Sequence, residues 1–173
     1  MPLLQKQGRQ IYWRTDGNPK LPKLVLLNSL GTEHGLWNPV MPSLLESFHV
    51  LRMDKRGHGG STVLVDTCSL AELADDVLSV MDAAGWARAS VCGVSIGGMQ
   101  AMWLGVHAPE RVERLVLSNT SAHIPAEVFA NRIAQVREQG LAAMAGQILG
   151  RVFTSGFIAA GSPAYHSVRE SLL

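Results

Sequence analysis

The stretch Gly93-Val94-Ser95-Ile96-Gly97 decides how the rest of this sequence is interpreted. It follows a short apolar run at 89–92 and opens a segment at 96–107 that has helical character and ends before Pro109. A serine at such a strand-to-helix turn is held in a strained backbone conformation, with its Oγ above the edge of the sheet. Glycines two residues to either side are needed where the strand and the helix approach too closely for side chains. The pattern therefore predicts that Ser95 is a nucleophile.

Two other interpretations of this glycine-rich turn are less favoured. A five-residue match alone also fits a purely structural serine, but its placement between a buried strand and a helix disfavours that reading. A phosphate-binding loop is disfavoured because the chain has no Gly-x-x-x-x-Gly-Lys-Ser/Thr motif, and no Gly-x-Gly-x-x-Gly follows its first apolar run. Nucleotide binding is therefore not expected.

Three more apolar runs, each too short for a helix, predict buried strands at 24–27, 50–53 and 114–117. Helical segments separate the runs. The clearest starts at a capping box of Ser69 and Glu72 and continues to Gly85, and a weaker helical pattern covers 36–48. Strands that alternate with helices predict an α/β fold with a mostly parallel sheet, right-handed crossovers and flanking helices.

The pattern changes after Thr120. The segments at 127–139, 141–152 and 164–172 have helical character, with no strand signal between them. We therefore expect residues 1–122 to form the N-terminal part of an α/β core and residues 123–173 to begin a helical cap.

Composition limits the possible partners and compartments. The chain of 173 residues carries a formal net charge of +1 without charge blocks, so neither nucleic acid nor an anionic membrane is an expected partner. The N-terminus lacks the apolar core of a signal peptide, and no stretch approaches the roughly 18 apolar residues that span a bilayer. Two cysteines, Cys68 and Cys92, form no paired framework. A cytoplasmic protein is the expectation.

An acyl-transfer serine needs backbone N–H groups that bind the developing oxyanion. The residue after the nucleophile, Ile96, supplies one predicted donor. The loop after the first buried strand, at 28–32, supplies the second, for which Leu30 is the candidate.

The general base is not evident in the chain. His58 lies in the glycine-rich turn at 54–61, where a structural role is the more common one, and this architecture places its base after the serine and the acid in chain order. The other five histidines either precede Ser95, end its helix or lie in or near the helical region; they are His34, His49, His107, His123 and His166. None of them follows a late strand.

Several stretches carry a resemblance to a known family: Leu27-Asn28-Ser29-Leu30-Gly31-Thr32, Leu51-Arg52-Met53-Asp54-Lys55-Arg56-Gly57-His58-Gly59, Cys92-Gly93-Val94-Ser95-Ile96-Gly97-Gly98-Met99, Trp103-Leu104-Gly105 and Leu115-Val116-Leu117-Ser118-Asn119-Thr120. They closely resemble the 3-oxoadipate enol-lactonases of the α/β-hydrolase superfamily. The Asn-Ser-Leu-Gly start of the first loop, in place of the commoner His-Gly, favours this family over generic esterases.

The resemblance implies hydrolysis of an enol-lactone in the breakdown of aromatic acids, with no metal and no organic cofactor. It assigns Ser95 as nucleophile and Leu30 and Ile96 as oxyanion donors, and Arg132 is a candidate for binding the carboxylate of the substrate. The family carries its acid after the seventh strand and its histidine after the eighth. We expect this chain to stop within the cap, with the C-terminal part of the core missing and the fragment inactive.

Three alternatives stay open at this point. The chain could belong to a carboxylesterase or a perhydrolase of the same fold, acting on another small-molecule ester. It could also be a catalytically dead, shortened binding module. A chain that stops within the cap also leaves the strand at 114–117 as an unprotected sheet edge, so self-association through that edge is an expectation.

Overall fold

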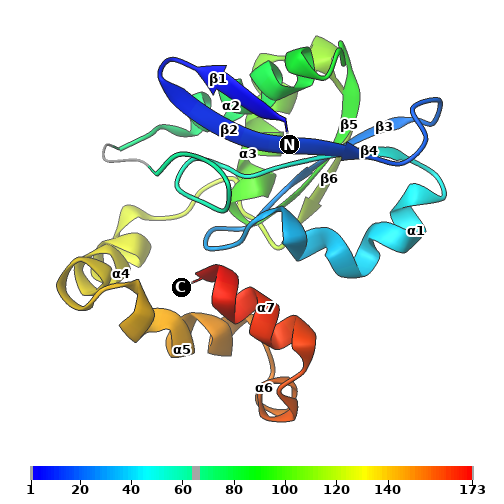
Figure 1. Ribbon diagram of the computed structural model, residues 1–173. Coiled ribbons are helices and arrows are strands. Elements are labelled where there is room, and N and C mark those ends of the chain that lie inside the picture. Colours follow the sequence, from blue (N-terminus) through cyan, green and yellow to red (C-terminus); the bar gives the residue numbers. More distant parts are fainter. Residues whose placement is uncertain (1, 64–66, 173) are drawn as a thin grey trace. The chain divides into compact units, whose positions relative to one another are not determined.

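The computed structural model describes residues 2–63 and 67–172. The chain divides into two compact units, Met1–Ala122 and His123–Leu173. The first holds a sheet with helices on both faces, and the second is built from helices (Figure 1).

The sheet of the first unit has six strands in the order β1-β2-β4-β3-β5-β6. The strands are β1 Leu3–Lys6, β2 Arg9–Asp16, β3 Lys23–Leu27, β4 His49–Met53, β5 Ala89–Val94 and β6 Val112–Ser118. Four neighbouring strands, β4, β3, β5 and β6, pair in parallel. The strand β2 pairs antiparallel with both β1 and β4. All four strands predicted from apolar runs are present, and the predicted α/β fold with its mostly parallel sheet is confirmed.

Two strands that were not predicted precede residue 24. The strands β1 and β2 form a hairpin whose turn, Gln7-Gly8, has positive φ at both residues, 50° and 76°. Only Ile11 and Tyr12 of β2 are buried. Elsewhere in the hairpin, charged and polar residues such as Lys6, Arg9 and Arg14 interrupt the apolar residues Leu4 and Trp13, a pattern that half-exposed strands near a sheet edge tolerate. This hairpin therefore lacks the continuous apolar run that marks the other strands in the sequence.

Helices cover both faces of the parallel strands. On one face, α2 (Leu70–Ala83) and α3 (Ile96–His107) pack against a core that includes Val25 and Leu51. On the other face, a 3-10 helix and the short α1 (Met41–Leu45) pack against alternate strand residues such as Leu26 and Val50. Apolar side chains on both faces explain why these strands appear in the sequence as continuous apolar runs.

The predicted helices at 96–107, 127–139, 141–152 and 164–172 are present within a residue or so at their ends, as is the one that begins after Ser69, but one helix prediction needs correction. The capping box of α2 is present, since Ser69 Oγ accepts the Glu72 amide at 3.2 Å and Glu72 Oε2 accepts the Ser69 amide at 2.8 Å. The single helix expected over 36–48 is instead a 3-10 helix, His34–Val40, followed by α1. Pro39 and Pro42 explain the interruption, because proline has no N–H to donate within a helix.

The second unit contains α4 Ala126–Gln139, α5 Leu141–Val152, α6 Ser155–Ala160 and α7 Pro163–Leu172. Residues Ala145, Leu149 and Leu172 form its small core. The helix α6, which begins at the cap of Thr154 Oγ1 on the Phe157 amide, was not predicted. Between residues 2 and 172, leaving out 64–66, no helix is long and apolar enough to cross a membrane.

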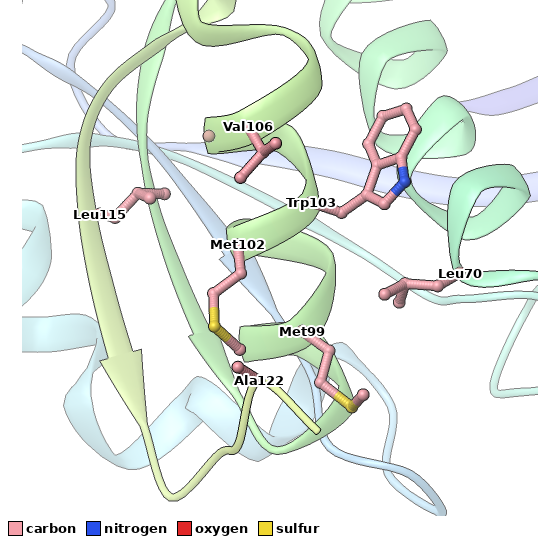
Figure 2. A pocket seen from close by; sticks show the side chains of 8 residues that line it. Leu70, Met99, Met102, Trp103, Val106, Leu115 and Ala122 are labelled. Carbon is pink, nitrogen blue, oxygen red and sulfur yellow. The ribbon is translucent and has the colours of Figure 1, made fainter. Parts of the chain in front are cut away.

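The outer strand β6 leaves apolar side chains in water. Leu115, Val116 and Leu117 are 38%, 56% and 44% exposed. Beside them lies an open apolar pocket of about 510 Å³ along α3, with Met102 and Trp103 among its lining residues (Figure 2). A strand with one free edge and apolar side chains on its faces is a template for pairing with another chain.

We therefore predict that this 173-residue polypeptide self-associates through β6. Replacing Val116 by Lys places a charge on the exposed strand and should weaken association by at least about tenfold in sedimentation velocity over a concentration series. Replacing Val63, which is 77% exposed and lies outside the sheet, by Lys is the matched control. A wild-type chain that stays monomeric at high concentration would contradict the prediction.

Candidate functional site

Ser95 lies in the turn between β5 and α3 with φ 56° and ψ −121°, a conformation that residues with side chains rarely adopt. The expected strained turn is therefore present. A Cβ on Gly93 would collide with the carbonyl of Gly97, and a Cβ on Gly97 would collide with the carbonyl of Leu27. Both positions are therefore restricted to glycine by backbone contacts, as the sequence spacing indicates.

Hydrogen bonds fix the backbone of Ser95 on both sides. Its amide donates to the carbonyl of Ser118 at 3.1 Å, and its carbonyl accepts from Thr120 Oγ1 at 2.7 Å and from the Met99 amide at 3.1 Å. Among the described residues, no side chain or backbone group is hydrogen-bonded to Ser95 Oγ. The turn is rigid while its hydroxyl remains available.

The two predicted oxyanion donors, Leu30 and Ile96, share one property. Within residues 2–63 and 67–172, neither backbone N–H has a hydrogen-bond acceptor. Ile96 follows Ser95 directly. The loop that carries Leu30 begins against the same turn, because a Cβ on Gly97 would lie 2.9 Å from the carbonyl oxygen of Asn28. The structure thus brings the loop after β3 to the turn that holds Ser95.

The loop after β4 holds the loop after β3 in place. Asn28 Nδ2 donates to the Met53 carbonyl at 2.8 Å, and Lys55 Nζ donates to the Ser29 carbonyl at 2.6 Å. The Gly31 amide donates to His58 Nε2 at 2.9 Å. His58 therefore has the structural role that the sequence favours, and Gly31 has no N–H left for a substrate.

Asp54 anchors this second loop from the inside. Its side chain is fully buried and accepts the amides of His34 at 2.7 Å and Gly60 at 2.9 Å. Burial raises the pKa of Asp54, but the hydrogen bonds from His34 and Gly60 outweigh burial and leave the pKa lowered. Asp54, Glu33 and His34 lie close enough together to hold a metal ion. Because both Asp54 oxygens already bind backbone amides, we interpret the cluster as a loop anchor.

The four histidines of the first unit bind other groups than Ser95. His34 contacts Asp54, and His58 binds the Gly31 amide. His107 Nδ1 donates to the Trp103 carbonyl at 3.0 Å, and the ring of His49 packs against Trp86 with centroids 4.9 Å apart. No general base for Ser95 is therefore found among the described residues of Met1–Ala122.

Arg132 lies in the second unit, on α4. Its guanidinium is over the ring of Phe129 at 5.6 Å. Its proposed contact with a substrate stays a prediction. The large apolar pocket along α3 does not include Ser95 among its lining residues (Figure 2).

Lys55 lies beside the candidate site, although the sequence did not single it out. This side chain is 5% exposed, and burial lowers its pKa to about 8 although the charge of Asp54 acts in the opposite direction. The only signal was its place in the run Asp54-Lys55-Arg56-Gly57-His58. A lysine in a glycine-rich turn is usually solvated, so that signal was too weak.

The alpha/beta hydrolase fold family matches residues 22–157. The chain therefore belongs to this family. The 3-oxoadipate enol-lactonase 1 of Acinetobacter baylyi is 35% identical over 156 residues, which are 90% of this chain and 58% of that protein. The chain thus spans 58% of the length of this relative.

Two crystal structures extend the likeness to nearly the whole chain. A hydrolase from Pseudomonas aeruginosa is 39% identical with a TM-score of 0.94, and the match covers 99% of this chain and 66% of that one. The enol-lactonase from Burkholderia xenovorans is 35% identical with a TM-score of 0.93, covering 99% of this chain and 67% of that one. The resemblance to enol-lactonases found in the sequence is confirmed.

The close contact at Gly97 can be tested by substitution. Replacing Gly97 by Ala forces the Cβ into the Leu27 carbonyl and should lower the free energy of unfolding by on the order of 2–3 kcal/mol in urea denaturation. Replacing Gly146 in α5, where a Cβ meets nothing within 4 Å, is the control and should be neutral or stabilising. Equal effects at both positions would refute the close contact.

Proposed function

We propose that this chain carries the nucleophile and the oxyanion donors of a serine hydrolase that cleaves a lactone or ester in the manner of the 3-oxoadipate enol-lactonases. The observation that carries the proposal is the turn at Ser95. Its strained backbone is fixed by hydrogen bonds, its hydroxyl is unengaged by described residues, and the Ile96 amide beside it has no described acceptor.

The reaction has two halves. Ser95 Oγ loses its proton to a general base and attacks the lactone carbonyl carbon, while the amides of Leu30 and Ile96 bind the resulting oxyanion. Collapse of this intermediate breaks the ring C–O bond, and the leaving oxygen takes a proton from the protonated base. Water, deprotonated by the same base, then attacks the acyl-enzyme and releases the carboxylate and Ser95.

The substrate class is inferred from the relatives. Two matched proteins are named as enol-lactonases, which favours a lactone in aromatic-acid degradation over a simple ester. No cofactor or metal takes part in the proposed steps. A cytoplasmic location, expected from composition, stays a prediction. A carboxylesterase or perhydrolase of the same fold is the alternative, and it would favour aryl esters over the enol-lactone.

We also propose that residues 1–173 alone hydrolyse the lactone slowly, because no described histidine of the first unit contacts Ser95. Without its base, a serine hydrolase retains about 10³- to 10⁴-fold acceleration over water from its oxyanion site and binding. A catalytically dead binding module would lack even this residual activity at Ser95.

The test is a chimera in which this chain is continued by the residues of the Acinetobacter relative beyond the matched segment. The chimera should hydrolyse the enol-lactone, and replacing Ser95 by Ala should lower kcat by about 10⁶-fold. The 173-residue chain should not be labelled by a fluorophosphonate, whereas the chimera should be labelled at Ser95. Rapid labelling of the 173-residue chain would overturn the proposed lack of a base.

The role of Arg132 is tested in the same chimera. If its guanidinium binds the free carboxylate of the lactone, replacing Arg132 by Ala should raise KM by about tenfold and leave kcat nearly unchanged. Replacing Arg137, on the same helix, by Ala serves as the control. An unchanged KM for the Arg132 variant would remove the residue from the site.

A further inference from the structure

The peptide group between Ser29 and Leu30 is held from one side. Its carbonyl oxygen accepts Lys55 Nζ at 2.6 Å and Thr32 Oγ1 at 2.9 Å. A peptide group is planar and trans, so its C=O and its N–H point in opposite directions. A lysine that fixes the Ser29 carbonyl therefore also fixes the direction of the Leu30 N–H.

The next peptide group, between Leu30 and Gly31, is held by His58. The Gly31 N–H donates to His58 Nε2 at 2.9 Å, and the other ring nitrogen, Nδ1, lies 3.0 Å from the Arg56 carbonyl. A backbone amide can only donate and a carbonyl can only accept. His58 must therefore be neutral, with its proton on Nδ1 and a lone pair on Nε2.

We propose that Lys55 and His58 are positioning residues, which together orient the Leu30 N–H toward the substrate oxyanion by fixing the two peptide groups that flank its Cα. This inference rests on the proposed function, because it assigns a task to the Leu30 amide. The ammonium of Lys55 has a second effect. A positive charge at the Ser29 carbonyl polarises that peptide group and makes its N–H a stronger donor.

The burial of Lys55 is hard to explain by stability alone. Burial lowers the pKa of Lys55 from 10.5 to about 8, while the charge of Asp54 raises it. Between these two pH values the unfolded chain keeps a proton that the folded chain has lost, so the stability of the fold rises with pH through this window. At neutral pH the buried ammonium destabilises the fold, and an apolar side chain would avoid that penalty.

His58 gives the arrangement a sensitivity to acid. Burial lowers its pKa and the charge of Lys55 lowers it further, whereas the Arg56 carbonyl and the charge of Asp54 raise it. A proton on Nε2 would remove the acceptor of the Gly31 amide. The hydrogen bond is therefore lost as pH falls through the lowered pKa of His58, and stability falls with it from about pH 6.5 downward.

Matched substitutions at His58 test the hydrogen bond directly. His58→Gln offers Oε1 close to the place of Nε2 but does not titrate, and His58→Leu offers no acceptor. In ¹H–¹⁵N NMR spectra of the 173-residue chain, the wild-type Gly31 amide should shift upfield as acid protonates His58. The Gln variant should keep the downfield position at all pH values, and the Leu variant should never show it. A Gly31 amide chemical shift that changes neither with substitution of His58 nor with pH would overturn the proposal.

Lys55→Met tests positioning against a merely structural role, with Lys20→Met, at an exposed position, as the control. We expect Lys55→Met to move the Leu30 amide resonance and to leave the free energy of unfolding at pH 7 unchanged or higher. In the chimera, the same substitution should lower the Ser95-dependent kcat by roughly tenfold to a hundredfold at similar KM. A variant that loses stability and keeps kcat would show a structural role only and would overturn the proposal.

The same measurements separate this inference from the proposed function. Ser95-dependent turnover is the rate of the chimera minus that of its Ser95→Ala variant. If that difference is zero, the proposed hydrolase function fails, while the NMR shifts still decide whether the two peptide groups are held as described. If the difference is large but Lys55→Met and His58→Leu leave kcat unchanged, the positioning role is refuted and the hydrolase function stands.

Discussion

The contact between the first turn of α3 and the end of β3 is the constraint on which the site depends. Gly97 lies so close to the carbonyls of Leu27 and Asn28 that no side chain fits between them. This approach places the loop after β3 beside the turn that carries Ser95. The strain at Ser95 is tolerated because the surrounding backbone hydrogen bonds over-determine its conformation.

A second set of polar contacts holds the loop after β3 in place beside Ser95. The loop after β4 is buried through Asp54, whose oxygens bind two backbone amides, and it reaches the loop after β3 through Lys55 and His58. Arg56 of the same loop forms a buried ion pair with Asp76 of α2. The geometry at Leu30 is thereby tied to the sheet and to a helix, although the residue itself lies in a loop.

The sequence predicted the parts of this molecule that follow from continuous apolar runs and glycine spacing. The strands β3 to β6 and the turn at Ser95 belong to these. The hairpin of β1 and β2 was not predicted because charged and polar residues interrupt its apolar ones, and the helix expected over 36–48 is broken by prolines. Lys55 was not singled out from the sequence for a different reason. Its importance depends on the direction of its side chain, which only the folded chain determines.

The side chain of Leu30 is 47% exposed, although both peptide groups beside it are held from within the protein. Backbone orientation at this position therefore does not depend on which side chain is present. Under the proposed function, Lys55 and His58 thus keep the oxyanion donor in place while the exposed side chain at position 30 is free to vary.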